Sequence, residues 1–273
     1  MLSSNLSGAF AALFDAAGTP DFGAGLDRLA LCVAQFDMSC VFAFSETAPP
    51  VVIHDGYSDS VDRRALQSYL RGAYLLDPFY AASVTARTVG LWRMAELAPD
   101  AYFDGDFVRS QEVHPCISDQ VGSLIEEIGY IVPLSEGFTA TYSLMRNRGG
   151  SSFASEEMTQ LESLVPVIAA SLRLHWRLAF STSRREMAVM ASDAVFEQAF
   201  DGLTPAQTSV AKMILRGHSG VSIAANLGIA EGTVKQHRHN IYKRLGISSQ
   251  SELFQRFIHY LQDPTLLREV PDQ

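Results

Sequence analysis

Apolar residues in the first two thirds of the chain repeat alternately with the period of a helix and with the period of a strand. Helical spacing marks the segments 22–36, 61–76 and 153–180. Runs typical of strands mark 38–44, 51–55, 88–94, 121–134 and 138–146. Asp77-Pro78 is expected to end or bend the second helix, because the residue before a proline avoids helical geometry. The turn at 135–137 predicts that the last two strands pair antiparallel.

From Leu203 onward the pattern is helical only. Thr204 is a suitable N-cap before Pro205, and Gly217 ends this first helix. Ser219 is placed to cap a second short helix, which ends at Gly228. The third and fourth helices are expected at 232–246 and 249–261. Two short helices joined by a tight turn that contains glycine form a helix-turn-helix pattern.

These patterns predict an α+β protein with two domains. We expect residues 1–178 to form an α/β/α sandwich with a central antiparallel sheet. Residues 179–202 lose clear periodicity and are interpreted as a linker. Residues 203–273 are expected to form an all-α, four-helix, helix-turn-helix domain.

Composition fits a globular protein, with 47% apolar and 19% charged residues. No apolar run approaches the roughly 18 residues that cross a bilayer, and the first residues lack the basic start of a secretory signal. Cys32, Cys40 and Cys116 are odd in number and lack metal-ligand spacing. We therefore expect a cytoplasmic protein with reduced thiols and no membrane partner.

Charge is unevenly distributed along the chain. The formal net charge is −9, yet residues 203–262 hold seven Lys or Arg against two Asp or Glu. That segment is therefore +5 and the remainder −14. Such an asymmetry indicates two modules with different partners, and it points to a polyanion as the partner of the basic one.

The basic charge concentrates in GTVKQHRHNIYKRLG, residues 232–246. On a helix that turns about 100° per residue, Val234, Ile241, Leu245 and His237 fall on one side, which is expected to be buried. Lysine, glutamine and arginine occupy the other faces, where they suit base edges and phosphates in a DNA major groove. A merely solvated helix face is the alternative, and the two preceding short helices favour DNA.

Two other interpretations of this region are weaker. His237 and His239 lie two positions apart on one helix, so they point in different directions and cannot chelate one ion. The sequence GHSG at 217–220 resembles a hydrolase elbow, but Val221 stands where the final glycine would be and no strand precedes it. We expect no metal, no cofactor and no catalytic residues.

The block IAANLGIAEGTVKQHRHNIYKRLGI, with LTPAQ and RGHS before it, closely resembles the LuxR-type, or GerE-type, DNA-binding domain over about 60 residues. The resemblance implies a four-helix module whose third helix enters the major groove of double-stranded DNA, usually as a homodimer. It places Lys235, Gln236 and His239 at bases. Nearer the phosphates it places Thr233, Lys243 and Arg244, and the helical spacing adds Arg238 as a flanking residue that can hold a phosphate. Ala206-Gln207 replaces the family's usual Arg-Glu.

Residues 69–92, YLRGAYLLDPFYAASVTARTVGLW, partly resemble the autoinducer-binding domain of quorum-sensing LuxR-type regulators. The Asp-Pro pair and the tryptophan fifteen residues later match, whereas Arg64 and Ser68 stand where that family has aromatic residues. The resemblance implies a ligand site with Asp77 as polar anchor and Trp92 as a wall, and Tyr69 and Tyr74, which lie nearby, are added as candidate ligand residues. A turn cap for the aspartate and a core position for the tryptophan are the alternatives. Tyr69 and Tyr74, five apart on one predicted helix, are not expected to share a face.

The leading hypothesis is a transcription regulator whose first domain senses a small molecule, either an acyl-homoserine lactone or a non-lactone signal. The alternative is a ligand-independent regulator, whose first domain is an interaction or dimerisation module using the end of the 153–180 helix, with Trp176 and Phe180. A two-component response regulator would need paired acids after the first strand, where only Glu46 is found. An enzyme is the remote possibility, because no nucleophile stands beside a base.

Overall fold

The computed structural model describes residues 4–57, 59, 61–104, 109–116, 124–147, 150–180 and 192–262. The chain divides into two compact units that do not follow sequence order. The first, here the sheet unit, contains residues 1–61, 79–97 and 116–189. The second, here the helical unit, contains residues 62–78, 98–115 and 190–273. The predicted boundaries near 178 and 203 stay predictions.

A five-stranded antiparallel sheet forms the middle of the sheet unit, in the order β2-β1-β5-β4-β3. The strands are β1 (Met38–Phe44), β2 (Val51–Gly56), β3 (Gly90–Arg93), β4 (Leu124–Pro133) and β5 (Thr139–Asn147). β1 is buried on both faces, because it lies inside the sheet with helices on either side. The antiparallel sheet confirms the predicted fold class.

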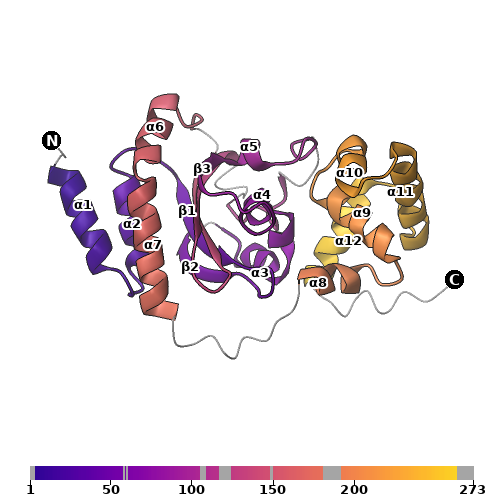
Figure 1. The fold of residues 1–273 in the computed structure, drawn as a ribbon, viewed down its shortest axis with the longest axis horizontal. Coiled ribbons are helices and arrows are strands. Elements are labelled where there is room, and N and C mark those ends of the chain that lie inside the picture. Colours follow the sequence, from indigo (N-terminus) through magenta and orange to yellow (C-terminus); the bar gives the residue numbers. More distant parts are fainter. Residues whose placement is uncertain are drawn as a thin grey trace. The chain divides into compact units, whose positions relative to one another are not determined.

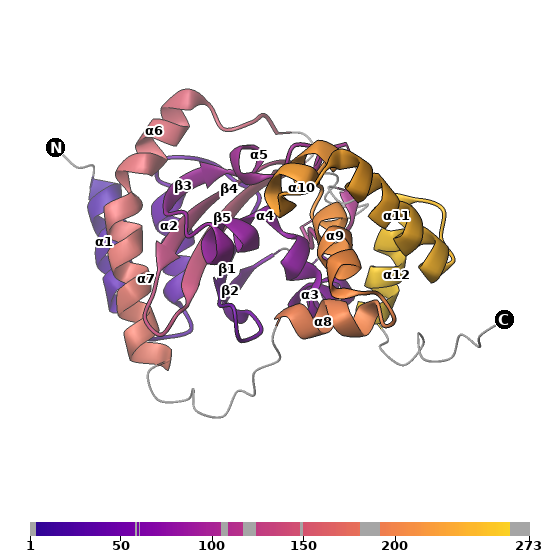
Figure 2. The same ribbon diagram turned by 45° about the vertical axis from the view of Figure 1, so that its right-hand side comes forward.

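One face of the sheet is covered by α2 (Phe22–Ala30) and α7 (Val165–Phe180), with α1 (Ser4–Asp15) outside α2 (Figures 1 and 2). The apolar core lies between this layer and strands β1, β4 and β5. The predicted helix 153–180 is divided into α6 (Ser155–Ser163) and α7. Pro166 accounts for the break, since it lacks the N–H that would bond to the preceding turn.

The opposite face of the sheet is covered by α4 (Pro78–Tyr80) and the π-helical turn η2 (Ala81–Thr85). Phe79 lies over Gly129 of β4 so closely that a β-carbon there would be 2.6 Å from the ring. Tyr80 contacts Phe44 edge to face, and Ser83 shares a 3.0 Å hydrogen bond with Thr141. The side chains of this short segment therefore pack directly on three strands.

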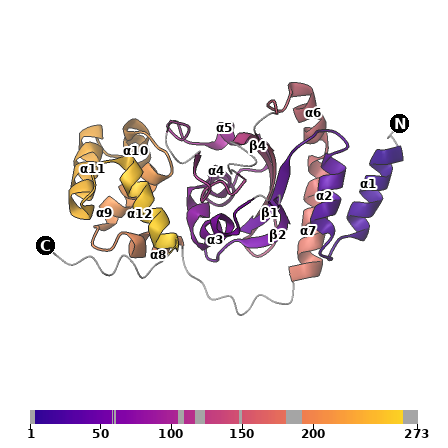
Figure 3. The same ribbon diagram turned by 180° about the vertical axis from the view of Figure 1, so that it is seen from behind.

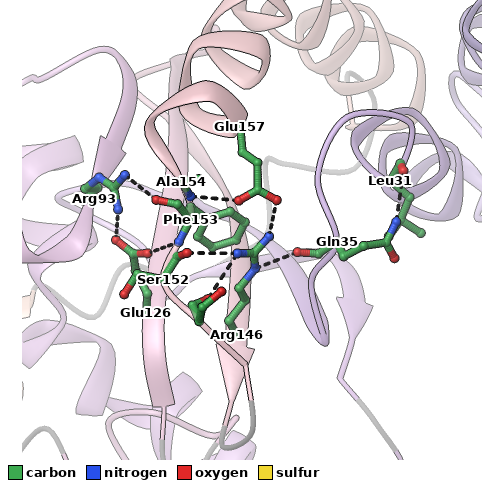
Figure 4. Close-up of polar contacts among 10 residues, drawn as sticks. Leu31, Gln35, Arg93, Glu126, Arg146, Ser152, Phe153, Ala154 and Glu157 are labelled. Atoms are coloured by element: carbon green, nitrogen blue, oxygen red, sulfur yellow. Dashed lines mark hydrogen bonds and ion pairs between the residues drawn. The ribbon is translucent and has the colours of Figure 1, made fainter.

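Arg146, at the end of β5, holds the connection from β5 to α6 (Figure 4). Its Nε donates to the Gln35 carbonyl, and Nη1 donates to the carbonyls of Ser151 and Ser152. Nη2 donates to Glu157 at 2.6 Å. A second ion pair joins Arg93 and Glu126. Arg93 donates to the Phe153 carbonyl and Glu126 accepts from the Phe153 amide, so this pair holds the same connection.

The helical unit combines chain segments from both sequence-predicted domains. Its N-terminal contributions are α3 (Arg63–Arg71), the 3₁₀ turn η1 (Ala73–Leu76) and the segment 98–115. Its C-terminal helices are α8 (Ser192–Ala199), α9 (Pro205–Leu215), α10 (Gly220–Leu227), α11 (Glu231–Leu245) and α12 (Gln250–Gln262). Figure 3 views these helices from the side opposite to Figure 1. The helix predicted at 61–76 is interrupted at Gly72.

Helix α8 lies inside the segment that the sequence indicates as a linker. Phe196 stacks on Phe257 of α12 with ring centroids 4.9 Å apart, and Phe200 stacks on the same ring at 5.9 Å. These contacts join α8 to the C-terminal helices. Residues 181–191 of the predicted linker lie outside the described residues.

The sheet unit also contains the short helix α5 (Met94–Leu97). The three cysteines are free thiols. Within the residues described above, no helix is long and apolar enough to span a bilayer.

Candidate functional site

Helix α9, which precedes the helix-turn-helix of α10 and α11, begins with a reciprocal cap. Thr204 Oγ1 accepts a hydrogen bond from the Gln207 amide, and Gln207 Oε1 accepts one from the Thr204 amide at 2.9 Å. Ala206 and Gln207 stand where the family that the sequence resembles usually has Arg and Glu. Together the two side chains satisfy two N–H groups that would otherwise lack partners at the start of the helix, one each.

Helix α10 and the turn after it set the entry to α11. Ser219 caps α10 by accepting a hydrogen bond from the Ser222 amide. Gly228 ends α10 in the left-handed conformation, with φ +64°, a region that favours glycine. Gly246 ends α11 in the same way, with φ +66°. Both glycines therefore stand where the backbone must turn sharply.

One side of α11 is anchored in the core of the helical unit. Val234 and Ile241 are buried, and α11 packs against α9 and α10. His237, expected on this side, is half-buried, as is Leu245. This arrangement leaves the rest of the helix surface facing outward.

All of the residues predicted to contact DNA lie on the exposed surface of α11: Thr233, Lys235, Gln236, Arg238, His239, Lys243 and Arg244. Two pairs along this surface hold each other. Gln236 Nε2 donates to Asn240 Oδ1 at 3.1 Å, and Arg238 Nε donates to the Tyr242 hydroxyl at 3.0 Å. The Arg238 guanidinium also lies 5.4 Å from the centre of the Tyr242 ring. These contacts orient the Gln236 and Arg238 side chains along the helix.

His218 lies in the turn between α9 and α10. His218 shares a 2.9 Å hydrogen bond with Ser222, and burial is the main cause that lowers its pKa. Across the described part of the chain, no three His, Cys, Asp or Glu side chains gather closely enough to hold a metal ion.

Three of the four residues predicted to bind a ligand lie together in the helical unit. The Tyr69 hydroxyl donates to Asp77 Oδ2 at 2.6 Å, a length typical of a hydrogen bond to a charged oxygen. Gly72 interrupts the helix between Tyr69 and Tyr74, so their rings meet edge to face, with centroids 6.4 Å apart. All three side chains are buried, with Asp77 only 7% exposed. The expectation that the two tyrosines would not share a face was wrong, because it assumed a continuous helix.

Trp92 belongs to the sheet unit, so the predicted ligand residues are divided between the two units. It is half-buried on β3, and its Nε1 donates to the Val89 carbonyl at 2.8 Å. A cavity of about 380 Å³ in the sheet unit is lined by other residues, from η2 and the β4–β5 turn.

Two charged residues that sequence reasoning missed contact the helix-turn-helix. Asp100 accepts hydrogen bonds from the backbone and hydroxyl of Ser219 at 3.1 and 2.6 Å. Arg71 donates to the carbonyls of Leu261 and Gln262 at the end of α12. No local pattern could have revealed them, since each contact joins residues more than a hundred positions apart.

Comparisons with known proteins match the helix-turn-helix region of this chain. The family model described as bacterial regulatory proteins, luxR family, matches residues 201–257. A regulator of Aeromonas salmonicida, named as an HTH-type transcriptional regulator in the exeN 3′ region, is 31% identical over 198 residues, which cover 68% of this chain and 94% of that protein. The nitrate/nitrite response regulator protein NarL of Escherichia coli is 33% identical over 36% of this chain and 38% of its own length.

Among solved structures, the VqsR LBD domain from Pseudomonas aeruginosa is similar in fold, with a TM-score of 0.55 at 22% identity. The similarity covers 66% of this chain and all of that structure. The antiparallel sheet described above differs from the parallel sheet of a doubly wound receiver domain. The relative from Aeromonas salmonicida, matched over nearly its whole length, shows that this chain belongs to the luxR family of bacterial transcriptional regulators.

Proposed function

We propose that this regulator binds promoter DNA as a homodimer through the exposed face of α11, and that a small molecule bound by the N-terminal part of the chain controls this binding. The observation that carries the proposal is the exposed basic and polar surface of α11, anchored beneath by Val234 and Ile241. A helix supported in this way can enter a major groove as a rigid element.

The residues of this surface are assigned two roles. Lys235, Gln236 and His239 contact base edges, where lysine suits guanine and glutamine suits adenine. Thr233, Arg238, Lys243 and Arg244 hold phosphates, which set the position of the helix without reading sequence. The pair of Gln236 and Asn240 already orients the glutamine amide along the groove-facing surface.

The two roles predict different effects of substitution. Lys235→Ala should cost roughly 1–3 kcal/mol at one base position of the preferred sequence. Arg244→Ala should weaken binding to every sequence and reduce the salt slope by about one. Fluorescence titrations of selected and scrambled duplexes at two salt concentrations measure both effects.

Arg177→Ala is the matched control, because Arg177 is exposed on α7 in the sheet unit. It removes the same charge and should leave the salt slope unchanged. Unchanged binding by both the Lys235 and Arg244 variants would contradict the proposed interface.

Ligand control is supported by the cluster of Tyr69, Tyr74 and Asp77. A buried carboxylate bonded to a phenol provides a polar anchor, and the aromatic rings provide apolar contact, which is the usual composition of a small-molecule site. A ligand with an N–H or O–H group could replace the phenol at Asp77. Ligand binding would then favour one conformation through its differential affinity.

Native mass spectrometry of the purified full chain tests this proposal. We expect a dimer that carries one small molecule per protomer, which is released on denaturation. Asp77→Asn should lower the occupancy, whereas Asp104→Asn, at an exposed position, should not. A chain with identical native and denatured masses per protomer would favour the ligand-independent alternative.

The ligand-independent alternative uses the end of α7 as its interface, and part of that surface is buried within the sheet unit. Trp176 is buried, with its ring 5.2 Å from that of Phe138 and 4.8 Å from that of Phe180. The tryptophan therefore belongs to the core of its own unit, and a ligand-independent dimer would need other residues of α7.

A further inference from the structure

Asp100 contacts the first helix of the helix-turn-helix at its N-terminus. One carboxylate oxygen accepts from the Ser219 hydroxyl at 2.6 Å, and the other accepts from the Ser219 amide at 3.1 Å. These two hydrogen bonds hold the pKa of Asp100 below its ordinary value, so the group is an anion at neutral pH. An internal carboxylate thus occupies the start of α10.

The start of this helix is where a DNA phosphate would be expected. The first helix of a helix-turn-helix crosses the DNA backbone while the second reads the groove. Helix N-termini offer unpaired N–H groups and the positive end of the helix dipole, which together bind phosphate. A serine hydroxyl adds a further donor of the kind that contacts DNA phosphates. Ser219 combines both features at the N-cap of α10.

We propose that Asp100 is an autoinhibitory residue, which occupies the phosphate-binding start of α10 and lowers DNA affinity until the segment around it moves away. This inference rests on the proposed DNA-binding function and deepens it. The base-reading face of α11 is already exposed, whereas the anion position on α10 is filled. In this conformation, therefore, the surface of α11 is open to DNA, whereas the start of α10 is not.

The neighbouring residues hold the carboxylate in place. The Ala101 amide donates to the Gly217 carbonyl at 3.1 Å. Gly217 has φ +84°, and a β-carbon there would lie 2.7 Å from the Tyr102 Cα. Tyr102 is fully buried, and its hydroxyl shares a 2.7 Å hydrogen bond with His114. The approach of residues 100–102 to the α9–α10 turn is thus a packed contact that depends on a glycine.

The helical unit also links the contact between Asp100 and Ser219 to the candidate ligand cluster. Arg216, at the end of α9, donates to the Leu75 carbonyl at 3.2 Å, and Leu75 lies in η1 between Tyr74 and Asp77. A ligand that displaces Tyr69 from Asp77 would shift η1, and with it the carbonyl that Arg216 holds. This provides a short physical route from ligand binding to the α9–α10 turn that Asp100 contacts.

The test compares three variants of the full chain on a labelled duplex of mixed sequence. A sequence-independent probe is sufficient, because the contact in question is with phosphate. Asp100→Ala should bind roughly two- to fivefold more tightly than the natural chain. Its plot of log affinity against log salt, between about 50 and 200 mM, should be steeper by about 0.9, since one more phosphate is engaged.

Asp100→Asn keeps a hydrogen-bond acceptor without the charge, and it should fall between the natural chain and Asp100→Ala. Asp104→Asn is the matched control, because Asp104 is exposed in the same segment and its substitution removes the same negative charge. It should leave the salt slope unchanged.

Equal slopes for Asp100→Ala and Asp104→Asn would overturn the autoinhibitory role. Failure of the natural chain and all variants to bind the duplex would instead contradict the proposed DNA-binding function. Circular dichroism confirms that each variant is folded, and a folded Asp100→Ala variant with weakened binding would assign Asp100 a supporting role and reject inhibition.

Discussion

At the scale of single residues, Arg146 shows how one buried charge can fix a connection between elements. Its guanidinium donates to three carbonyl oxygens and to Glu157, and it lies 4.0 Å from the centre of the Phe153 ring. The hydrogen bond from Arg146 is the main cause that lowers the pKa of Glu157. The carboxylate is therefore charged at neutral pH, and its contribution to stability is lost as the pH falls through the lowered pKa.

We expect Arg146→Met to lower the free energy of unfolding by roughly 2–3 kcal/mol, because it leaves carbonyls and a carboxylate without their donor. Urea denaturation followed by circular dichroism measures this change. Arg173→Met, which removes one exposed hydrogen bond to the Pro133 carbonyl, should cost less than about 0.5 kcal/mol. The difference between the two variants should shrink in acid, since Glu157 is then protonated. A similar loss for both would show that the network adds little.

At the scale of elements, the packing of α4 on β4 depends on the absence of a side chain. Gly129 faces the Phe79 ring, and this contact covers the side of the sheet opposite to α2 and α7. The strand pattern of residues 121–134 predicts β4 correctly, yet it does not show why a glycine stands in the strand. A close approach by another element is the usual reason.

Gly129→Ala should therefore destabilise the protein by roughly 1–3 kcal/mol, because the ring or the strand must shift to admit the methyl group. Gly8→Ala serves as the control. It lies in α1 with no atom near the added carbon, and it should be neutral or stabilising by up to about 1 kcal/mol. Thermal denaturation of both variants measures the contrast, and an unchanged midpoint for Gly129→Ala would show that Phe79 can move freely.

At the scale of the whole molecule, the compact units cut across the order of the chain. Residues 62–78 and 98–115 join the C-terminal helices through the contacts of Arg71, Asp100 and Arg216. The helix-turn-helix is thus part of a larger body, which includes the candidate ligand cluster of Tyr69 and Asp77. In the proposed ligand control, the signal passes within one packed unit, because the cluster and the C-terminal helices both belong to the helical unit.

Much of the architecture was predictable because local periodicity encodes it. The five strands, the antiparallel β4–β5 pair and the four helices from α9 to α12 lie close to the predicted ranges. The exposed surface of α11 followed from the spacing of Val234 and Ile241. Helix α1 was not predicted. The breaks at Gly72 and Pro166 were also missed, because apolar spacing continues across residues that end a helix.

The sequence by itself determined the family, the sheet and the basic helix, since each depends on residues that are neighbours along the chain or share one helical face. Only the tertiary structure decided the partners of Tyr69 and Asp100. The interruption at Gly72 folds the chain so that Tyr69, Tyr74 and Asp77 meet. Asp100 reaches Ser219 across 119 positions. Such contacts depend on how distant elements pack, and the local spacing of apolar residues carries no record of that packing.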